Sequence, residues 1–392
     1  MILWFPAKKG SLMELPWRDR ISAQPMFDVL SQANNREALG HYVARMEIGD
    51  TPGFRNDAIH KLLSKYSKEP HRYSPSSGEG ALIESLFEME WPTLSRVENE
   101  ISVAPANFLI TAALASVTVP GDLVLIPDPG FPTYELSCQF LGLQVSYYSI
   151  YPNPQMRFPN LESFCSENSL KPKVVIINNP SNPLGIAFDG KDVELSIKSL
   201  AHAGVEIIID ETYVNLVYDD IDPHIPNVAA TRIRSFSKEH CAPGLRIGYA
   251  IAKKQHARVI SDFISLTISC APKFIQLAVA EYLKSDERII FNKHVNETMS
   301  VRIDHLADKI PSNFLSYKPN SAFYALIETG NGAQAFDFLM SQNIATCPGF
   351  KFGNSTINTV RVSLSGLESR FEHDLTMLCD ALKRLPSETQ IR

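Results

Sequence analysis

Four groups of residues in this chain combine an amine, carboxylates, amides and a guanidinium. Their sequences are Asp-Pro-Gly-Phe-Pro-Thr-Tyr at 128–134, Asn-Pro-Ser-Asn-Pro-Leu-Gly at 179–185, Asp-Glu-Thr-Tyr at 210–213, and Arg-Ser-Phe-Ser-Lys at 234–238 followed by Pro-Gly-Leu-Arg-Ile-Gly-Tyr at 243–249. A lysine amine forms an imine with an aldehyde, and its neutral form is favoured when it is desolvated or lies near another cation. Arg246 follows Lys238 by eight residues. Its guanidinium could be that cation and could also hold a dianionic phosphate in a fork.

Short apolar runs precede these groups and predict strands. The clearest runs cover residues 123–126, 145–150, 174–177 and 205–209. Between the last two, apolar residues recur at helical spacing over 193–201, and Gly204 ends the predicted helix. This alternation indicates βαβ units around a mostly parallel sheet that is buried on both faces. Ligands of such sheets bind beyond the carboxyl ends of the strands, so the polar groups are expected to meet there.

Each group also has an ordinary structural interpretation when it is taken alone. Asp-Pro-Gly and Asn-Pro-x-Asn-Pro are common turn formers, and a Ser-x-Ser-Lys sequence is usually found at the surface. Asp210 could simply cap the next helix. The order and spacing of all four groups together favour a functional site over four unrelated turns.

The last hundred residues have a different pattern. Long helical patterns follow residue 290, a late strand is expected at 359–363, and Leu375, Leu378, Cys379 and Leu382 have the spacing of an amphipathic helix. We therefore expect a large α/β domain over residues 45–285. A smaller domain is expected from residues 286–392, completed by residues 1–44.

The motifs Asn-Pro-x-Asn-Pro-x-Gly, Asp-Glu-x-Tyr, Ser-x-Ser-Lys and Pro-Gly-Leu-Arg-x-Gly-Tyr occur in this order along the chain. Together they resemble the class I/II aminotransferases, enzymes of fold type I that depend on pyridoxal 5′-phosphate (PLP). The resemblance runs from about residue 48 to residue 363. It implies an aspartate aminotransferase-like fold, with a mostly parallel sheet flanked by helices in the large domain and a smaller α/β domain.

The resemblance also implies roles for the catalytic residues. Lys238 would form a Schiff base with PLP, and Asp210 would pair with the pyridinium nitrogen. Tyr213 and Asn182 would hydrogen-bond the ring hydroxyl oxygen, and Phe131 would lie against the ring face. A carboxylate paired with the ring nitrogen favours its protonated form, on which the electron-withdrawing power of PLP depends. Lys238, once free of the imine, could move a proton as general base and acid.

Other residues would hold the two anionic groups. Ser235 and Arg246 would bind the phosphate, and Tyr73 would reach the phosphate of a neighbouring subunit's cofactor. Arg361 would bind the substrate α-carboxylate, together with Asn182. Without the other motifs, a solvated strand arginine is the more common interpretation of such a residue. With them, the planar fork of Arg361 favours carboxylate capture.

The chain departs from the family pattern at three places. The phosphate loop reads Ala-Pro-Ala-Asn at 104–107, and Pro105 has no N–H to donate. Ala106 and Asn107 are still expected to present N–H groups at a helix N-terminus, which favours an anion. Leu184 replaces a common Thr, and Ser321 stands where Gly is usual. These changes suggest a divergent branch with an unusual substrate or reaction.

Composition excludes several other classes of protein. The chain has 392 residues, 37 Lys+Arg against 43 Asp+Glu, and 44% hydrophobic residues, which is an ordinary globular composition. The acidic balance argues against a nucleic-acid partner, and no apolar run is long enough to cross a membrane. The six cysteines and ten histidines have no metal-binding spacing. We expect a cytoplasmic protein without a metal.

The predicted function is a PLP-dependent aminotransferase that passes an amino group from an amino acid to a 2-oxo acid in a ping-pong reaction. The family resemblance further implies a homodimer. One alternative is another PLP enzyme of the same fold, either a β-eliminating lyase or a specialised cyclase or synthase. A non-catalytic effector-binding domain is a weaker alternative, because no basic helix-turn-helix segment precedes residue 40. The sequence leaves side-chain specificity open.

Overall fold

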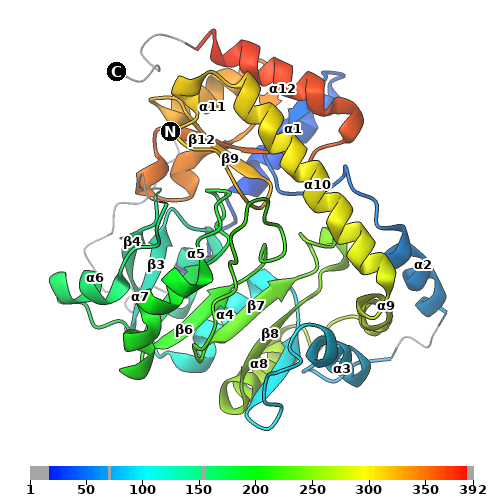
Figure 1. The fold of residues 1–392 in the computed structure, drawn as a ribbon, viewed down its shortest axis with the longest axis vertical. Helices are drawn as coiled ribbons and strands as arrows, with labels where there is room; N and C mark the ends of the chain where they lie inside the picture. The colour runs from blue at the N-terminus through cyan, green and yellow to red at the C-terminus, as the bar shows by residue number, and fades with distance from the viewer. Residues whose placement is uncertain (1–16, 69–71, 152–155, 386–392) are drawn as a thin grey trace.

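The computed structural model describes residues 17–68, 72–151 and 156–385. A seven-stranded sheet with helices on both faces forms one part, and a smaller sheet with its own helices lies against it (Figure 1). The strand order of the large sheet is β2-β8-β7-β6-β5-β3-β4. Its strands are β2 (Asn99–Val103), β3 (Leu123–Asp128), β4 (Gln144–Ser149), β5 (Val174–Asn178), β6 (Glu206–Asp210), β7 (Thr231–Ser235) and β8 (Gly248–Lys253).

The large sheet is mostly parallel, as predicted. Neighbours β4, β3, β5, β6 and β7 pair in parallel, while β8 runs antiparallel to both β7 and β2. The predicted strands at 123–126, 145–150, 174–177 and 205–209 correspond to β3, β4, β5 and β6. All five residues of β5 are buried, which explains its continuous apolar run.

Alternate residues of the large-sheet strands enter two hydrophobic layers. Val174, Ile176 and Ile208 pack with α4, α5 and α8, whereas Val175 and Ile207 pack with α6 and α7 on the other face. The helices are α1 (Met26–Ala38), α2 (Asp57–Tyr66), α3 (Gly80–Met89), α4 (Ala106–Val117), α5 (Thr133–Leu141), α6 (Leu161–Glu167), α7 (Gly190–His202), α8 (Lys254–Thr267), α9 (Lys273–Leu283), α10 (Asp286–Lys309), α11 (Gly332–Ser341) and α12 (Glu368–Leu382). The predicted helices at 193–201 and 375–382 lie within α7 and α12.

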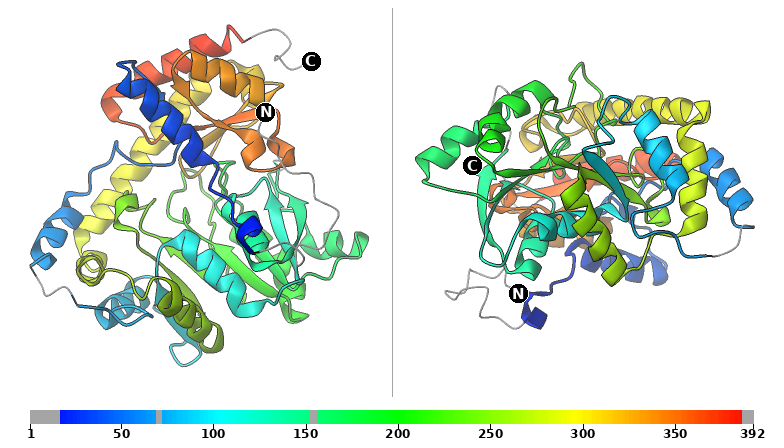
Figure 2. Two further views of the ribbon diagram at one scale, coloured as in Figure 1. Left: turned by 180° about the vertical axis from the view of Figure 1, so that it is seen from behind. Right: turned by 90° about the horizontal axis from the view of Figure 1, so that it is seen from below.

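The smaller sheet has the antiparallel order β11-β12-β9. A separate parallel pair joins β1 to β10, so the chain before α2 packs with the C-terminal part. Figure 2 shows α1 beside this part, with the chain before it running toward the large sheet. The strands are β1 (Ala44–Arg45), β9 (Tyr324–Glu328), β10 (Ile344–Ala345), β11 (Cys347–Pro348) and β12 (Thr359–Ser363). Short 3₁₀ turns η2 to η6 lie at Trp17–Arg20, Pro243–Leu245, Ser312–Phe314, Gly349–Lys351 and Asn354–Thr356.

The two sheets are joined by close backbone contacts. An isolated bridge pairs Val217, which follows β6, with Ser321, which precedes β9. Gly185 lies in the left-handed region at φ +68°, and a Cβ there would come within 2.1 Å of the Tyr324 carbonyl oxygen. The glycine of the Asn-Pro-x-Asn-Pro-x-Gly motif is therefore required both by its backbone conformation and by this approach.

A buried ion network lies beneath the carboxyl ends of the strands. The Glu211 carboxylate pairs with Arg234 at 2.9 Å and with Arg232 at 2.5 Å, and Arg234 also pairs with Glu90 at 2.9 Å. The Arg234 guanidinium lies 4.4 Å from the Trp91 ring centroid. Burial alone would raise the pKa of Glu211, but Arg234 and Arg232 lower it below its usual value. The network therefore stabilises the fold at neutral pH, and this contribution is lost as the pH falls and Glu211 takes up a proton.

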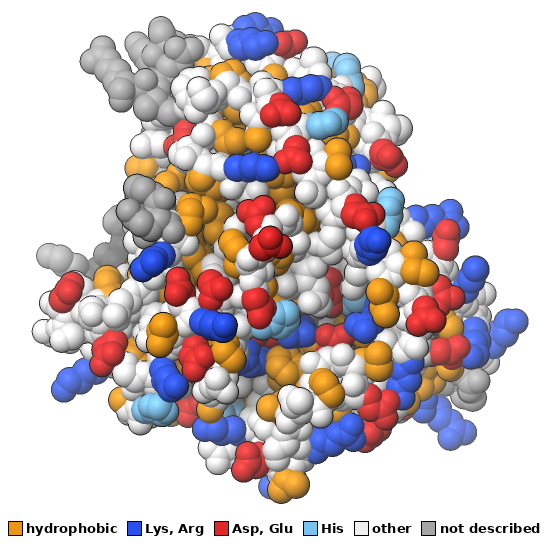
Figure 3. Space-filling model, in the orientation of Figure 1, with side chains coloured by type: hydrophobic (Ala, Val, Ile, Leu, Met, Phe, Trp, Pro, Cys, Tyr) orange, Lys and Arg blue, Asp and Glu red, His pale blue; other side chains and the backbone are white. Residues whose placement is uncertain are grey.

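Thiols and surface charge complete the description. All six cysteines are free, and five are buried while Cys270 is half-buried. Acidic and basic side chains are interspersed on the face shown in Figure 3. Within the described ranges, no helix has the length and apolar character needed to span a bilayer.

We predict that Glu211→Gln destabilises the protein by about 3–5 kcal/mol, because it leaves the buried Arg234 and the half-buried Arg232 guanidinium groups without full compensation. Denaturant unfolding followed by circular dichroism measures this change. Glu84→Gln is the matched control, since the Arg96–Glu84 pair is exposed, with side-chain exposures of 48% and 57%. The control should cost about 1 kcal/mol or less. Equal losses in the two variants would contradict a structural role for the buried network.

Candidate functional site

The predicted polar residues gather at one edge of the large sheet. Asp210 is the last residue of β6 and Ser235 is the last residue of β7, and these two strands are parallel neighbours. The motif that contains Asn182 follows β5, which pairs with β6 on the other side. The parallel order thus brings three separate motifs to the same edge, as the sequence predicted.

Asp210 is buried, and both of its carboxylate oxygens accept hydrogen bonds. The Tyr134 hydroxyl donates to Oδ2 at 2.8 Å. The Thr212 backbone N–H and hydroxyl donate to Oδ1 at 3.1 and 2.6 Å. A turn, not a helix, follows Asp210, so the helix-cap alternative does not apply. Burial raises the pKa of Asp210 although these hydrogen bonds lower it, so a cation opposite the carboxylate would relieve a real electrostatic cost.

Lys238 lies on the loop after β7, with its side chain half-buried. Its Nζ donates to the Gly49 carbonyl oxygen at 2.5 Å, which connects this loop to the chain after β1. That partner is a neutral oxygen that a competing group could replace. The lysine amine is thus held near the strand edge without a carboxylate bonded to it among the described residues.

A second group of residues suits a phosphate. Helix α4 begins at Ala106, directly after Pro105, whose carbonyl oxygen accepts from the N–H groups of Phe108 and Leu109. Arg246 Nη2 donates to Asn107 Oδ1 at 3.4 Å, which brings the Pro-Gly-Leu-Arg motif to this helix end. The first N–H groups of a helix have no acceptor within it, so those of Ala106 and Asn107 are available to an anion.

Arg361 is fully buried on β12, so the interpretation as a solvated strand arginine is wrong. Nη1 donates to Asn182 Oδ1 at 2.8 Å and Nη2 to the Glu47 carbonyl oxygen at 2.9 Å. Within the described part of the chain, Arg361 forms no ion pair, and its Nε has no hydrogen-bond partner. Its guanidinium carbon lies 4.1 Å from the Tyr324 ring centroid. The charge is buried without a counter-ion, which fits a site for an external carboxylate.

Of three further predicted residues, Tyr213 and Phe131 lie in the buried group and Tyr73 is exposed. Tyr213 is buried, and its hydroxyl lies 3.1 Å from that of Tyr324. The half-buried Phe131 ring makes an edge-to-face contact with Tyr134, with the centroids 5.9 Å apart. Tyr73 is 87% exposed on the chain before α3 and is not part of the buried group. The single chain thus brings together all the predicted site residues except Tyr73.

Sequence reasoning missed Tyr134, Gly49 and Tyr324. Tyr134 belongs to the Asp-Pro-Gly-Phe-Pro-Thr-Tyr group, so its position after β3 was a usable signal. Gly49 and Tyr324 lie far from the motifs in sequence, and only the packing of the small sheet brings them to Lys238 and Tyr213. No local pattern predicts such contacts.

The donor set fits PLP. Asp210 matches a protonated ring nitrogen, and Tyr213 and Asn182 offer groups that hydrogen-bond a ring hydroxyl oxygen. Ser235, Arg246 and the start of α4 match a phosphate. The guanidinium of Arg361, which forms no ion pair among the described residues, matches a carboxylate on the substrate side.

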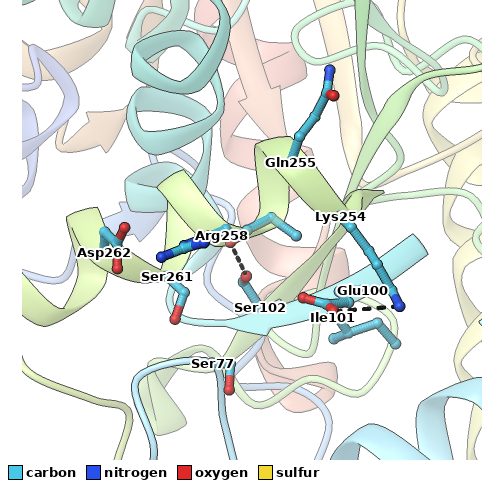
Figure 4. A pocket seen from close by; sticks show the side chains of 10 residues that line it. Ser77, Glu100, Ile101, Ser102, Lys254, Gln255, Arg258, Ser261 and Asp262 are labelled. Atoms are coloured by element: carbon cyan, nitrogen blue, oxygen red, sulfur yellow. Dashed lines mark hydrogen bonds and ion pairs between the residues drawn. The ribbon is translucent and has the colours of Figure 1, made fainter. Parts of the chain in front are cut away.

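Two pockets lie on the surface around the large sheet. A pocket of about 440 Å³ lies between the start of β2 and α8, where Lys254 and Glu100 are 4.0 Å apart and the Ser102 hydroxyl donates to the Ala257 carbonyl oxygen (Figure 4). None of the predicted site residues lines it. A second pocket of about 340 Å³ lies between residues 20–24, α4 and α5, and Asn107 and Thr133 line it. The second pocket therefore borders Asn107, one of the residues predicted to bind a phosphate.

Comparisons with known proteins agree with this chemistry. The family model of aminotransferase class I and II matches residues 58–382. The chain is 29% identical over 330 residues to an aspartate aminotransferase of Thermococcus kodakarensis, covering 82% of this chain and 85% of that protein. It is 25% identical over 396 residues to a probable aspartate/prephenate aminotransferase of Aquifex aeolicus, covering 93% and 97%. In fold, it matches the aspartate aminotransferase of Thermus thermophilus with a TM-score of 0.85 at 19% identity, covering 93% and 98%.

We predict opposite effects of Asp210→Asn on stability and on PLP affinity. An amide keeps the acceptor for Thr212 but removes a buried charge, so the cofactor-free protein should melt at a higher temperature at pH 7. The raised pKa fixes this sign, because a buried acid destabilises the fold once the pH exceeds its unfolded value. The same variant should bind PLP more weakly.

Thermal melts and absorbance titrations with PLP measure both effects. Asp189→Asn is the matched control, since the exposed Asp189 caps α7 and asparagine caps equally well. The control should leave both values unchanged. Unaltered PLP affinity in Asp210→Asn would show that this carboxylate does not face the cofactor.

Proposed function

Because the chain belongs to the family of class I and II aminotransferases, we propose that it uses PLP to move an amino group from an amino acid to a 2-oxo acid in a ping-pong reaction. One observation carries the proposal. The buried guanidinium of Arg361 has no carboxylate partner among the described residues, and it shares Asn182 with the cofactor-binding group. An amino acid carries the carboxylate that this position lacks.

The positions of the side chains at the strand edge support the proposed cofactor contacts. Asp210 holds the ring nitrogen, while Tyr213 and Asn182 bind the ring hydroxyl oxygen. Phe131, whose ring edge is fixed by Tyr134, lies against the ring face. Ser235, Arg246, Ala106 and Asn107 bind the phosphate.

Lys238 is the proposed catalytic amine. Bound PLP withdraws electrons from the α-carbon of an attached amino acid and so makes the α-proton acidic. Lys238 attaches the cofactor in the resting enzyme and, when released, carries this proton at Nζ. Its hydrogen bond to the Gly49 carbonyl oxygen holds the amine at the strand edge.

We propose that Arg361 and Asn182 orient the substrate. The guanidinium can donate to both oxygens of an α-carboxylate, and Asn182 Oδ1 already accepts from Nη1 at 2.8 Å. This contact places the α-carbon at a constant position whatever the side chain, because every α-amino acid carries the carboxylate.

The domain division and the subunit arrangement are also proposals. The site lies between a large domain of residues 45–285 and a small domain made from 1–44 and 286–392, which is supported by the contact of Arg361 on β12 with Asn182 after β5. A homodimer is supported by Tyr73, whose 87% exposed ring is available to a second copy. In that dimer, Tyr73 reaches the phosphate of the partner's cofactor.

A cytoplasmic location is proposed on the basis of the thiols. All six cysteines are free, and disulfides are rare in reducing compartments.

We predict that the purified protein is yellow with PLP and that borohydride fixes a pyridoxyl group on Lys238. Peptide mapping by mass spectrometry locates the modified residue. Lys238→Ala should bind PLP weakly through the phosphate contacts but show no pyridoxyl peptide and no turnover. A pyridoxyl group on another lysine, or none at all, would refute the central assignment. Product analysis of the same protein with amino acids and 2-oxo acids distinguishes transamination from elimination or cyclisation.

We predict that Arg361→Lys lowers kcat/KM for an amino acid roughly 10- to 100-fold, the scale of one charge-assisted hydrogen bond. The cofactor absorbance should hardly change, because Arg361 is not assigned to PLP. The decarboxylated amine of the same amino acid should lose much less, since it has no carboxylate to bind.

Arg302→Lys is the matched control. Arg302 is also buried, but its guanidinium donates to the carbonyl oxygens of Leu364 and Gly366 away from the site. The control should leave the ratio of kcat/KM for the amino acid to kcat/KM for the amine unchanged, even if the substitution lowers the stability of the protein. If Arg361→Lys reduced both substrates equally, Arg361 would be structural and the substrate would not be an α-amino acid.

A further inference from the structure

Tyr324 contacts three groups of the proposed site and has no assigned role. It is the first residue of β9 and is only 2% exposed. Its hydroxyl and ring lie against Tyr213, Arg361 and Gly49, which come from three separate segments. A side chain that contacts all three groups can hold them in fixed positions relative to one another.

The first contact joins two phenols. The hydroxyl groups of Tyr213 and Tyr324 are 3.1 Å apart, and their rings meet edge to face with centroids 5.8 Å apart. Backbone pairing between Val217 and Ser321 fixes the segments that carry them. The hydrogen bond therefore belongs to a rigid junction between the two sheets.

The second contact supports the guanidinium of Arg361. Its central carbon lies 4.1 Å from the Tyr324 ring centroid and 4.6 Å from that of Phe352. Arginine stacks on aromatic rings in this way, and the ring quadrupole favours the cation. The Tyr324 ring is thus one of the two surfaces that hold the plane of the carboxylate fork.

The third contact places the Tyr324 hydroxyl next to the lysine's partner. A Cβ on Gly49 would lie 1.7 Å from the Tyr324 hydroxyl oxygen, so this oxygen packs directly on the glycine. The carbonyl oxygen of the same glycine accepts from Lys238 Nζ. The hydroxyl therefore packs on the residue that accepts from Lys238, and the charges of Lys238 and Arg361 both act on it.

The two phenols have different electrostatic surroundings. Burial would raise the pKa of Tyr324, but Lys238 and Arg361 lower it below its usual value. The pKa of Tyr213, in contrast, is raised well above its usual value by burial. The positive charges of Lys238 and Arg361 repel a proton that points toward them, so the favoured arrangement has the Tyr324 hydroxyl donating across the 3.1 Å contact to the Tyr213 oxygen. The proton of Tyr213 is then free to point at a third group.

We propose that Tyr324 is a positioning residue, whose hydroxyl directs the Tyr213 proton toward the cofactor's ring oxygen and whose ring holds the guanidinium of Arg361 for the substrate carboxylate. This inference rests on the proposed function, because it needs PLP beside Tyr213. It gives one side chain two roles, one toward the cofactor's ring oxygen and one toward the substrate carboxylate.

Tyr324→Phe tests the hydroxyl while it keeps the ring. Without the donor from Tyr324, the bond from Tyr213 to the ring oxygen weakens, and a weaker bond favours the deprotonated cofactor less. The pH midpoint of the absorbance change of the PLP-loaded protein should rise by about 0.3–1 unit, the scale of one hydrogen bond. The KM for amino acids should stay within about twofold, because the stacking on Arg361 remains.

Tyr324→Leu tests the ring. It should show the same midpoint shift and, in addition, a several-fold higher KM for amino acids but not for the decarboxylated amine. A purely structural role would lower stability without moving either the midpoint or this ratio.

A double-mutant cycle isolates the contact between the two phenols. In a Tyr213→Phe background, Tyr324→Phe should produce no further midpoint shift, since no Tyr213 proton remains to be directed. Tyr218→Phe is the matched control. It removes another tyrosine hydroxyl at the same junction, one that donates to the Ala322 carbonyl oxygen, and it should leave the midpoint unchanged.

The outcomes separate this inference from the proposed function. Borohydride labelling of Lys238 in every variant that keeps this lysine establishes that PLP is bound in its place. Absence of the label and of cofactor absorbance in the unsubstituted protein would overturn both proposals. A labelled protein whose midpoint is unmoved by Tyr324→Phe, or moved equally in the Tyr213→Phe background, would overturn the role of Tyr324 alone.

Discussion

A buried positive charge that has no counter-ion among the described residues is the constraint around which the site is arranged. The Arg361 guanidinium is removed from water, and such a charge is costly unless its donors are satisfied. The fold offers Asn182, a backbone oxygen and two aromatic rings, yet leaves Nε unpaired among the described residues. Both sheets contribute to this compensation. In the proposed function, a substrate carboxylate would relieve the remaining electrostatic cost, and substrate binding would then depend on how closely the two sheets pack.

Much of the site was predictable because its polar residues lie at the ends of strands. Asp210 follows an apolar run, whereas Ser235 ends β7, whose sequence Thr-Arg-Ile-Arg-Ser has no continuous apolar run. Parallel pairing of the two strands brings their ends together. The fold class, the family and the predicted strands and helices are confirmed for the same reason, since periodicity and turn motifs are local signals. The roles of the individual residues stay predictions until the cofactor is located.

Contacts between distant segments could not be predicted. The Gly49 oxygen is 189 positions from Lys238, and Tyr324 is 111 positions from Tyr213. Neither residue belongs to a motif, and both positions depend on how the small sheet packs against the large one. The expected contact of Tyr73 could not appear within one chain for a different reason, because it needs a second copy of the chain. A single sequence encodes such contacts only through the complete fold.

Because nearly all of the free thiols are buried, the number of cysteines that react with an alkylating reagent can measure how far the structure has opened. Burial raises the pKa of Cys138 and Cys241 to about 12 and that of Cys347 to about 11, and the thiolate is the form that reacts. Cys270 is the half-buried exception among the six cysteines. An alkylating reagent should therefore modify one site rapidly in the native protein and the others only as the structure opens. The number of added reagent masses after a timed pulse would report how many buried cysteines had become accessible to solvent in each molecule.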